Sequence, residues 1–307
     1  MQPGESNIEG NNVLTVDWLA DGRPDAATIA AARGKRPETT LDPEIAETFR
    51  RDGVALMRGA FVDWVAPLRR GLARNLAAPE AFAFPCESTR QGDAGRFFDS
   101  YCNWRLIPEY TAFVLHSPAA AIAGQAMGAR RAQLFHEHAF VKEPGTQRAT
   151  PWHQDLPYYG VDGTRTVSVY IALDPAPEDV AVRFVAGSHR SGTLYQPRIF
   201  LDGLPFNVED ASFAPVPDID ADPGAYDIRA FALEPGDAVL FDFRTLHGTT
   251  DAPVRRRRSA FSTRWLGDDV CYRVRPGETS PPFPGIGLAD GAPMREDWFP
   301  VLWAAED

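Results

Sequence analysis

The chain has 307 residues, enough for one large domain or two ordinary ones, and its 44% hydrophobic and 24% charged residues are ordinary for a globular protein. Its formal net charge of −11 argues against nucleic acid or an anionic membrane as a partner, because phosphates would repel it. We find no secretory leader, no apolar run long enough to span a membrane and no paired cysteine spacing. We therefore expect a soluble, cytoplasmic protein without a disulfide framework or a zinc site.

The N-terminal third predicts mostly helices. Residues 1–41 contain polar, Gly-rich stretches and predict an irregular N-terminal arm. The sequence Asp42-Pro43-Glu44 is typical of a helix start, and Gly53 is typical of a helix end. Further elements are expected in chain order: a strand over 54–61, a helix with an apolar stripe over 63–76 and a helix over 117–128. Residues 42–130 are thus predicted to form a helix-rich flank.

The character changes at residue 131, where short apolar runs separated by Gly, Pro and Asp predict an antiparallel sandwich or barrel. The expected strands are 132–141, 166–173, 181–185, 231–233, 238–243, 259–266 and 269–274. This core is predicted to end at residue 275 and to contain a lid-like insertion over 191–228, since so long a loop is usually functional or disordered. Residues 276–307 are Pro/Gly-rich but carry aromatics, which predicts a packed tail. We expect residues 1–307 to form one domain.

A possible metal motif follows the first of these strands. Residues 151–155 read Pro-Trp-His-Gln-Asp. In an extended H-x-D segment the first and third side chains point the same way, so His153 and Asp155 can converge on one point. A second histidine would complete the facial triad that holds Fe(II) with open positions. Alone the motif is weak, because a surface histidine near an aspartate is common.

A second motif lies ninety-four residues further on. Residues 235–248 read PGDAVLFDFRTLHG, in which a turn precedes a β-rich run that delivers His247. Arg258 follows His247 by eleven residues and opens the run RSAFSTRW. A guanidinium on a strand that faces a metal suits a dicarboxylate cosubstrate, because its planar fork binds a carboxylate through two hydrogen bonds.

Together these segments resemble the phytanoyl-CoA dioxygenase family, most closely its broad bacterial branch. The resemblance rests on WHQD, PGD-LFDF-LHG and the Arg-x-A-F-S-x-R-W run, with VKEPGT, GSHRSG and SPPFP also similar. It implies a mainly β fold with flanking helices, in which a double-stranded β-helix (jelly roll) forms the core. It also implies Fe(II), 2-oxoglutarate and dioxygen as cofactor and cosubstrates. The presence of the carboxylate Asp155 favours hydroxylation over halogenation.

The resemblance also implies roles for particular residues. The metal ligands are expected to be His153, Asp155 and His247. Arg258 and Thr249 are expected to bind the far carboxylate of 2-oxoglutarate, and Gln154 and Tyr170 to lie beside this cosubstrate. The expected substrate contacts are Arg264, Tyr158, Tyr159, His138, Tyr195 and Phe206.

Some of these residues have simpler explanations. His136 and His138 share a strand face and could line a pocket, but satisfied core or cleft histidines are the simpler interpretation. Arg264 shares a face with Arg258 and is either paired with a buried carboxylate or available to an anionic substrate group. Lys142 either pairs on the surface or contacts substrate.

The sequence therefore predicts an Fe(II), 2-oxoglutarate-dependent dioxygenase that hydroxylates a small or mid-sized, partly apolar metabolite. The alternatives are a jelly-roll module that only binds metal, and a cupin-type enzyme that works without 2-oxoglutarate. Retention of Arg258 and Thr249 argues against the first, since a bare metal site needs no anchor for a dicarboxylate. The identity of the substrate and the oligomeric state stay open.

Overall fold

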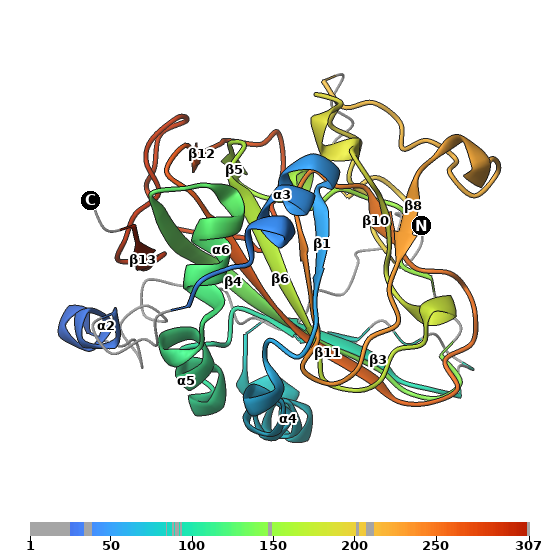
Figure 1. The fold of residues 1–307 in the computed structure, drawn as a ribbon, viewed down its shortest axis with the longest axis horizontal. Coiled ribbons are helices and arrows are strands. Elements are labelled where there is room, and N and C mark those ends of the chain that lie inside the picture. The colour runs from blue at the N-terminus through green and yellow to red at the C-terminus, as the bar shows by residue number, and fades with distance from the viewer. Residues whose placement is uncertain are drawn as a thin grey trace, which may run out of the picture.

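A large antiparallel sheet forms the centre of the molecule (Figure 1). The computed structural model describes residues 25–33, 39–83, 85–87, 89, 92, 94–146, 149–200, 203–206 and 212–305. Within these residues the main sheet has eight strands in the order β1-β9-β6-β11-β4-β3-β2, with β13 also paired to β4. Their bounds are β1 Val54–Met57, β9 Ala238–Phe241, β6 Thr166–Ala172, β11 Arg258–Leu266, β4 Arg131–Lys142, β3 Phe97–Tyr101, β2 Pro85–Glu87 and β13 Val301–Ala304.

A smaller sheet packs against one face of the main sheet and completes a double-stranded β-helix. It has the order β10-β7-β8, with bounds β10 His247–Gly248, β7 Arg183–Val185 and β8 Ile228–Ala230. Phe184 of β7 packs between the two sheets against Val239 and Phe241 of β9. A separate pair joins β5 Val161–Asp162 to β12 Cys271–Tyr272. The expected jelly-roll core is confirmed.

Helices cover the opposite face of the main sheet (Figure 1). Their bounds are α2 Ala26–Arg33, α3 Pro43–Asp52, α4 Val62–Ala77, α5 Pro108–His116 and α6 Ala119–Met127. Short 3₁₀ helices span Pro79–Ala81, Leu156–Tyr158, Glu178–Val180, Ser188–Arg190 and Pro223–Ala225. The largest apolar core lies between these helices and β4, β6, β9 and β11. Of the described helices, none is both long and apolar enough to cross a membrane.

Helix α3 has the ends that its sequence predicts. The Asp42 carboxylate accepts a hydrogen bond from the Glu44 N–H at 2.9 Å, and Pro43 occupies the first turn, where its missing N–H costs nothing. Gly53 ends the helix at φ 72°, a left-handed conformation that favours glycine. The chain then turns directly into β1 beside β9, the strand that leads toward the second histidine motif.

Four predictions about individual elements need correction. The irregular arm contains α2, which begins at Ala26, directly after Asp25, whose side chain accepts a hydrogen bond from the Thr28 N–H. The helix continues through an alanine-rich run of high helix propensity, and the other residues of the arm lie mostly outside the described ranges. The helix-rich flank also supplies β2 and β3 to the main sheet, and α5 was not expected. A strand predicted over 231–233 lies instead at β8, three residues earlier.

The C-terminal tail adds a strand and aromatic side chains to the body. Strand β13 pairs antiparallel with the start of β4. Trp298 and Phe299 are buried in a second apolar cluster, where the Phe299 ring centroid lies 5.3 Å from that of Phe135. The tail therefore packs against one end of β4, the strand that carries His136 and His138.

Candidate active site

The two histidine motifs meet through a short backbone bridge. His153 follows the loop after β4, and His247 begins β10. Each residue donates its backbone N–H to the other's carbonyl oxygen at 2.9 Å. This reciprocal pair fixes the two backbones relative to one another, so the two imidazoles lie with their ring centroids 4.1 Å apart.

The side chains of His153, Asp155 and His247 converge on one point. One ligand atom from each residue lies within 4.8 Å of the others, and Asp155 Oδ1 is 3.7 Å from Nε2 of both histidines. His153 Nδ1 lies 2.8 Å from the Pro151 carbonyl oxygen and His247 Nδ1 lies 2.9 Å from that of Thr245. A carbonyl oxygen only accepts, so Nδ1 carries the proton and Nε2 presents its lone pair.

This donor set fits Fe(II). Two neutral imidazoles and one carboxylate form the facial set that non-haem iron enzymes use, and the backbone partners at Nδ1 are the outer-shell contacts that orient metal-binding histidines. Burial, together with the adjacent His153 ring, lowers the pKa of His247 to about 3, so this imidazole is neutral near pH 7. The three residues can therefore hold a divalent metal ion.

Arg264 and Ser168 hold the free side of the Asp155 carboxylate. Burial alone would raise the pKa of Asp155, but the Arg264 charge and the neighbouring histidines outweigh it and hold this pKa well below its usual range. Arg264 Nη2 lies 3.7 Å from Asp155 Oδ2, and the Ser168 hydroxyl donates to the same oxygen at 3.3 Å. Arg264 Nε also donates to the Tyr159 hydroxyl at 3.2 Å. Of the two alternatives for Arg264, the geometry favours pairing with a buried carboxylate.

A cavity of about 330 Å³ opens beside the triad. The main sheet supplies one wall, from the side chains of β3, β4, β6 and β11 that alternate onto its inner face. Among its lining residues are Phe97, Asp99, Tyr101, His136, His138, Phe140, Lys142, Tyr158, Tyr159, Tyr170, Arg198, Phe200, Phe206, Thr249, Arg258 and Arg264. Residues 198–200 and Phe206, from the expected lid-like insertion, lie over this cavity.

One end of the cavity carries Arg258. Its side chain is buried, one terminal nitrogen donates to the Val180 carbonyl oxygen, and the other donates to the Tyr170 hydroxyl at 3.3 Å. Thr249 also lines the cavity, and its hydroxyl accepts a hydrogen bond from the Thr150 N–H at 2.7 Å. Arg258, Thr249 and Tyr170 thus all line the cavity, and Tyr170 contacts Arg258.

Gln154 and Tyr195 do not lie where the sequence predicts. The Gln154 amide donates to the Thr193 and Arg244 carbonyl oxygens and accepts from the Tyr195 N–H, on the side away from the cavity. The reason is the alternation that brings His153 and Asp155 together, because it turns the residue between them outward. Tyr195 packs in a separate apolar cluster with Trp152. The other expected substrate contacts, Tyr158, Tyr159, His138, Phe206 and Arg264, line the cavity.

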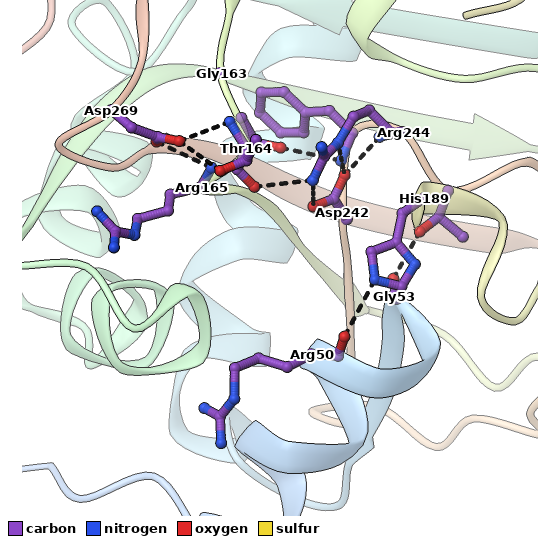
Figure 2. A network of polar contacts seen from close by, with 12 residues as sticks. Arg50, Gly53, Gly163, Thr164, Arg165, His189, Asp242, Arg244 and Asp269 are labelled. Atoms are coloured by element: carbon purple, nitrogen blue, oxygen red, sulfur yellow. Dashed lines mark hydrogen bonds and ion pairs between the residues drawn. The ribbon is translucent and has the colours of Figure 1, made fainter. Parts of the chain in front are cut away.

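A polar network behind the site fixes the loop that delivers His247 (Figure 2). Arg244 donates to both carboxylate oxygens of Asp242 and to the Thr164 carbonyl oxygen. Asp269 in turn accepts from the Thr164 N–H and hydroxyl, which ties the loop to the start of β6. This network closes one side of the 242–246 loop.

The other side of the same loop rests on Gly53. The Thr245 hydroxyl donates to the Gly53 carbonyl oxygen at 2.8 Å, and His189 Nε2 lies 3.2 Å from the Arg50 carbonyl oxygen (Figure 2). A side chain on Gly53 would collide with the His189 ring and the Thr245 hydroxyl. Since the Thr245 carbonyl holds His247 Nδ1, the α3–β1 junction helps to set the orientation of a candidate metal ligand.

Residues 49–258 match the family model for phytanoyl-CoA dioxygenase (PhyH). The chain belongs to the phytanoyl-CoA dioxygenase family. It is therefore an enzyme of the Fe(II), 2-oxoglutarate-dependent class, and the His153, Asp155 and His247 cluster is the candidate site for its metal. Comparison with curated protein sequences gives no significant match.

Solved structures share the fold at low sequence identity. The carbocyclase SnoK from nogalamycin biosynthesis is 21% identical with a TM-score of 0.65, over 87% of this chain and 99% of that one. The epimerase SnoN, in complex with Fe³⁺, α-ketoglutarate and nogalamycin RO, is 22% identical with a TM-score of 0.65, over 85% and 100%. EctD from S. alaskensis, with 2-oxoglutarate and 5-hydroxyectoine, is 19% identical with a TM-score of 0.59, over 84% and 88%.

Sequence reasoning missed the part of the cavity that β3 supplies. Asp99 and Tyr101 line the cavity beside His136 and His138. The available signal was the run FFDSY, in which a carboxylate stands among aromatics at alternating positions. That signal is faint, since β3 is buried on both faces and its polar residue looks like a loop residue in sequence.

Proposed function

We propose that this member of the phytanoyl-CoA dioxygenase family is a dioxygenase that hydroxylates a C–H bond of a small or mid-sized, partly apolar metabolite. The observation that carries the proposal is the convergence of His153, Asp155 and His247 beside a cavity whose far end presents Arg258. A metal-binding module or a cupin-type enzyme without 2-oxoglutarate needs no buried guanidinium at that place.

Different residues around the cavity would bind the metal ion and 2-oxoglutarate. The triad would hold Fe(II), which would supply the activation of dioxygen that C–H cleavage needs. Arg258 and Thr249 bind the far carboxylate of 2-oxoglutarate, and Tyr170 supports the Arg258 guanidinium. A dicarboxylate held at that end presents its keto acid end toward the triad.

Other residues orient the metal carboxylate and keep water out. Arg264 and Ser168 hold one oxygen of Asp155, so the other is free to face the metal. Phe200 and Phe206 cover the cavity from the 191–228 insertion, and the Phe200 ring centroid lies 4.7 Å from that of His153. We infer that this insertion acts as a lid, because a strong oxidant is best generated where water is excluded.

The mass of the product distinguishes hydroxylation from cyclisation and epimerisation. The protein is incubated with Fe(II), 2-oxoglutarate, ¹⁸O₂ and a panel of apolar, hydroxylated small molecules, with succinate measured in parallel. Hydroxylation adds one labelled oxygen atom to the product, cyclisation removes two hydrogens, and epimerisation leaves the mass unchanged. We expect a labelled oxygen and stoichiometric succinate; succinate with a product that gains no oxygen would refute hydroxylation.

A further inference from the structure

The cavity has a second polar region, distinct from the metal triad and from the Arg258 end. It consists of Asp99 of β3 and His136 and His138 of β4, and we call it the β3/β4 corner. Asp99 is 7% exposed and His136 is 2% exposed, so both were removed from water during folding. Buried polar groups normally have hydrogen-bond partners, and a corner without them is a place where a ligand can supply them.

Three buried side-chain atoms in this corner have no hydrogen-bond partner among the described residues. They are His138 Nε2 and the two acceptors Asp99 Oδ1 and His136 Nε2. His136 Nδ1 lies 3.2 Å from the Glu137 carbonyl oxygen, which can only accept, so Nε2 bears a lone pair. Asp99 Oδ2 lies 3.5 Å from His138 Nε2, which leaves Oδ1 as the unused oxygen. The corner therefore requires hydrogen-bond donors from its ligand.

The corner lies at a defined position relative to the triad. His136 pairs with Arg264 in the β4–β11 register, and Asp99 pairs with Phe140 one strand further out. Adjacent strands are about 4.8 Å apart, so β3 lies roughly 10 Å across the sheet from β11, the strand that carries Arg258 and Arg264. A ligand in the corner can thus lie beside 2-oxoglutarate without displacing it.

The charges around the cavity restrict the kind of donor. Among its described lining residues Arg198, Arg258 and Arg264 carry three positive charges, against the two carboxylates of Asp99 and Asp155. A bound Fe(II) ion would roughly balance the two charges of 2-oxoglutarate, so a net positive field remains. This field disfavours an ammonium group, while Asp99 itself would repel a carboxylate. Neutral hydroxyl groups meet neither penalty.

Aromatic rings surround the corner and favour an apolar body for the ligand. The His138 ring stacks on Phe140 with centroids 3.9 Å apart, and the Tyr101 ring meets His138 edge-on at 5.0 Å. Phe200 and Phe206 close the cavity from the insertion. Flat, apolar walls of this kind suit fused rings better than a flexible polar chain.

We propose that the β3/β4 corner binds hydroxyl groups of a neutral, ring-containing, partly apolar substrate, with Asp99 Oδ1 and His136 Nε2 as the acceptors. The inference rests on the proposed function, because it names the substrate class of the same cavity. It is favoured over the anionic substrate that Arg264 left open, since that guanidinium uses Nη2 for Asp155 and Nε for Tyr159, and of its nitrogens only Nη1 has no partner among the described residues. Asp99 and His136 are then specificity-determining residues rather than structural ones.

The test compares four probes that share one bicyclic body: decahydronaphthalene-2,3-diol, 2-decalone, 2-aminodecalin and decalin-2-carboxylate. Their dissociation constants are measured by calorimetry on the anaerobic protein with Fe(II) and 2-oxoglutarate. We expect the diol to bind at least tenfold more tightly than each of the others. Tightest binding of the amine or the carboxylate, or equal binding of all four, would overturn the proposal.

Matched variants locate the binding within the cavity. Asp99→Asn should remove most of the diol preference, with the dissociation constant of 2-oxoglutarate unchanged, and His136→Phe should do the same if the first variant folds poorly. The controls are Asp63→Asn and His116→Gln, which change exposed residues on α4 and α5. A diol affinity that survives both corner variants contradicts the assignment.

The two proposals can fail separately. The diol titration is repeated without Fe(II) and 2-oxoglutarate, since the corner acceptors need neither. If the protein binds the diol through Asp99 but does not bind 2-oxoglutarate, the proposed function is refuted and the assignment of the β3/β4 corner is supported. If the protein binds 2-oxoglutarate but shows no preference for the diol, only the proposal that the β3/β4 corner binds hydroxyl groups is refuted.

Discussion

Arg258 shows how one side chain is prepared for a dicarboxylate. Its guanidinium is buried at the end of the cavity, where it donates to two neutral oxygens, the Val180 carbonyl and the Tyr170 hydroxyl. Among the described residues no carboxylate pairs with this charge. A buried charge of this kind is stabilised when an anion reaches it, which is the role proposed for 2-oxoglutarate.

The first prediction removes that charge. Arg258→Met should raise the apparent KM for 2-oxoglutarate at least tenfold, because loss of one partner of a buried charge pair costs about 2–5 kcal/mol. Fe(II) affinity should change much less. The matched control is Arg256→Met, an exposed arginine two residues earlier. An unchanged KM in Arg258→Met would move the anchor to another residue.

The second prediction concerns Gly53, which has φ 72° and no room for a side chain beside His189 and Thr245. Gly53→Ala should lower the free energy of unfolding by about 2–5 kcal/mol, since it combines a left-handed alanine with a steric collision. Gly192→Ala is the control, because Gly192 has φ 71° but nothing within 4 Å of the added atom. If chemical denaturation shows the same loss of unfolding free energy in both variants, the collision at Gly53 does not contribute to the effect.

At the residue scale, period-two alternation accounts for both the success and the error of the sequence analysis. Alternation placed His153 and Asp155 on one side, and the structure brings them together with His247. The same rule turns Gln154 away from the cavity, so its expected contact with 2-oxoglutarate conflicted with the geometry that predicted the ligands. Tyr195 lies on a loop, where no periodicity indicates which way a side chain points.

Among the elements, the 242–246 loop joins β9 to β10 and determines where His247 lies. Its two supports are the Asp242–Arg244–Thr164 network and the Gly53 carbonyl oxygen (Figure 2). Neither touches the cavity. A site of this kind depends on supporting contacts as well as on its ligands.

The third prediction tests that support. Arg244→Met removes three hydrogen bonds that hold the loop, and it should weaken Fe(II) binding roughly tenfold, as loss of an outer-shell partner commonly does. Anaerobic metal titration gives the affinity. Arg273→Met is the control, since it breaks arginine–aspartate pairs of similar length on the surface. Equal Fe(II) affinity in the two variants would show that the network supports only the fold.

At the element scale, strands that stand between clear turn signals were predicted, although most of their residues are buried on both faces. Strands β4, β6, β9 and β11 lie within or close to the predicted runs because their apolar residues stand between clear turn signals. Strand β3 and helix α5 were missed because β3 mixes Asp and Ser with aromatic residues, and because α5, in which four of nine residues are buried, carries no clear amphipathic pattern. The missed strand is the one that supplies Asp99, so the substrate corner could not be predicted either.

At the scale of the whole molecule, Glu137 links stability to pH. It lies on the face of β4 opposite the cavity, where Oε1 accepts from the Asn103 N–H and Oε2 has no partner among the described residues. Burial raises the pKa of Glu137 to about 8 from an ordinary value of 4.5. The folded protein therefore keeps this proton up to about pH 8, whereas the unfolded chain releases it near pH 4.5.

The fourth prediction follows from the direction in which burial moves that pKa. The stabilising contribution of the bound proton is complete below pH 4.5 and is lost as the pH rises to about 8, at about 1.4 kcal/mol for each pH unit between the two values. Glu137→Gln should abolish this part of the pH dependence, so the variant gains a few kcal/mol over the natural protein between pH 5 and pH 8. Chemical denaturation of both proteins at pH 5 and pH 8 measures the free energies of unfolding. If this free energy changed equally with pH in both proteins, the buried, protonated state of Glu137 would be contradicted.

The whole account depends on Fe(II) and 2-oxoglutarate binding together at the His153, Asp155 and His247 triad. An Fe(II) ion chelated by a 2-keto acid absorbs visible light through charge transfer, and this absorption requires no substrate. We therefore propose anaerobic titration of the Fe(II)-loaded protein with 2-oxoglutarate, in the natural chain and in His247→Ala. The account predicts a saturable visible band in the natural protein and its loss in a folded His247→Ala variant. No band in the natural protein, or the same band in both proteins, would contradict the assignment of the site.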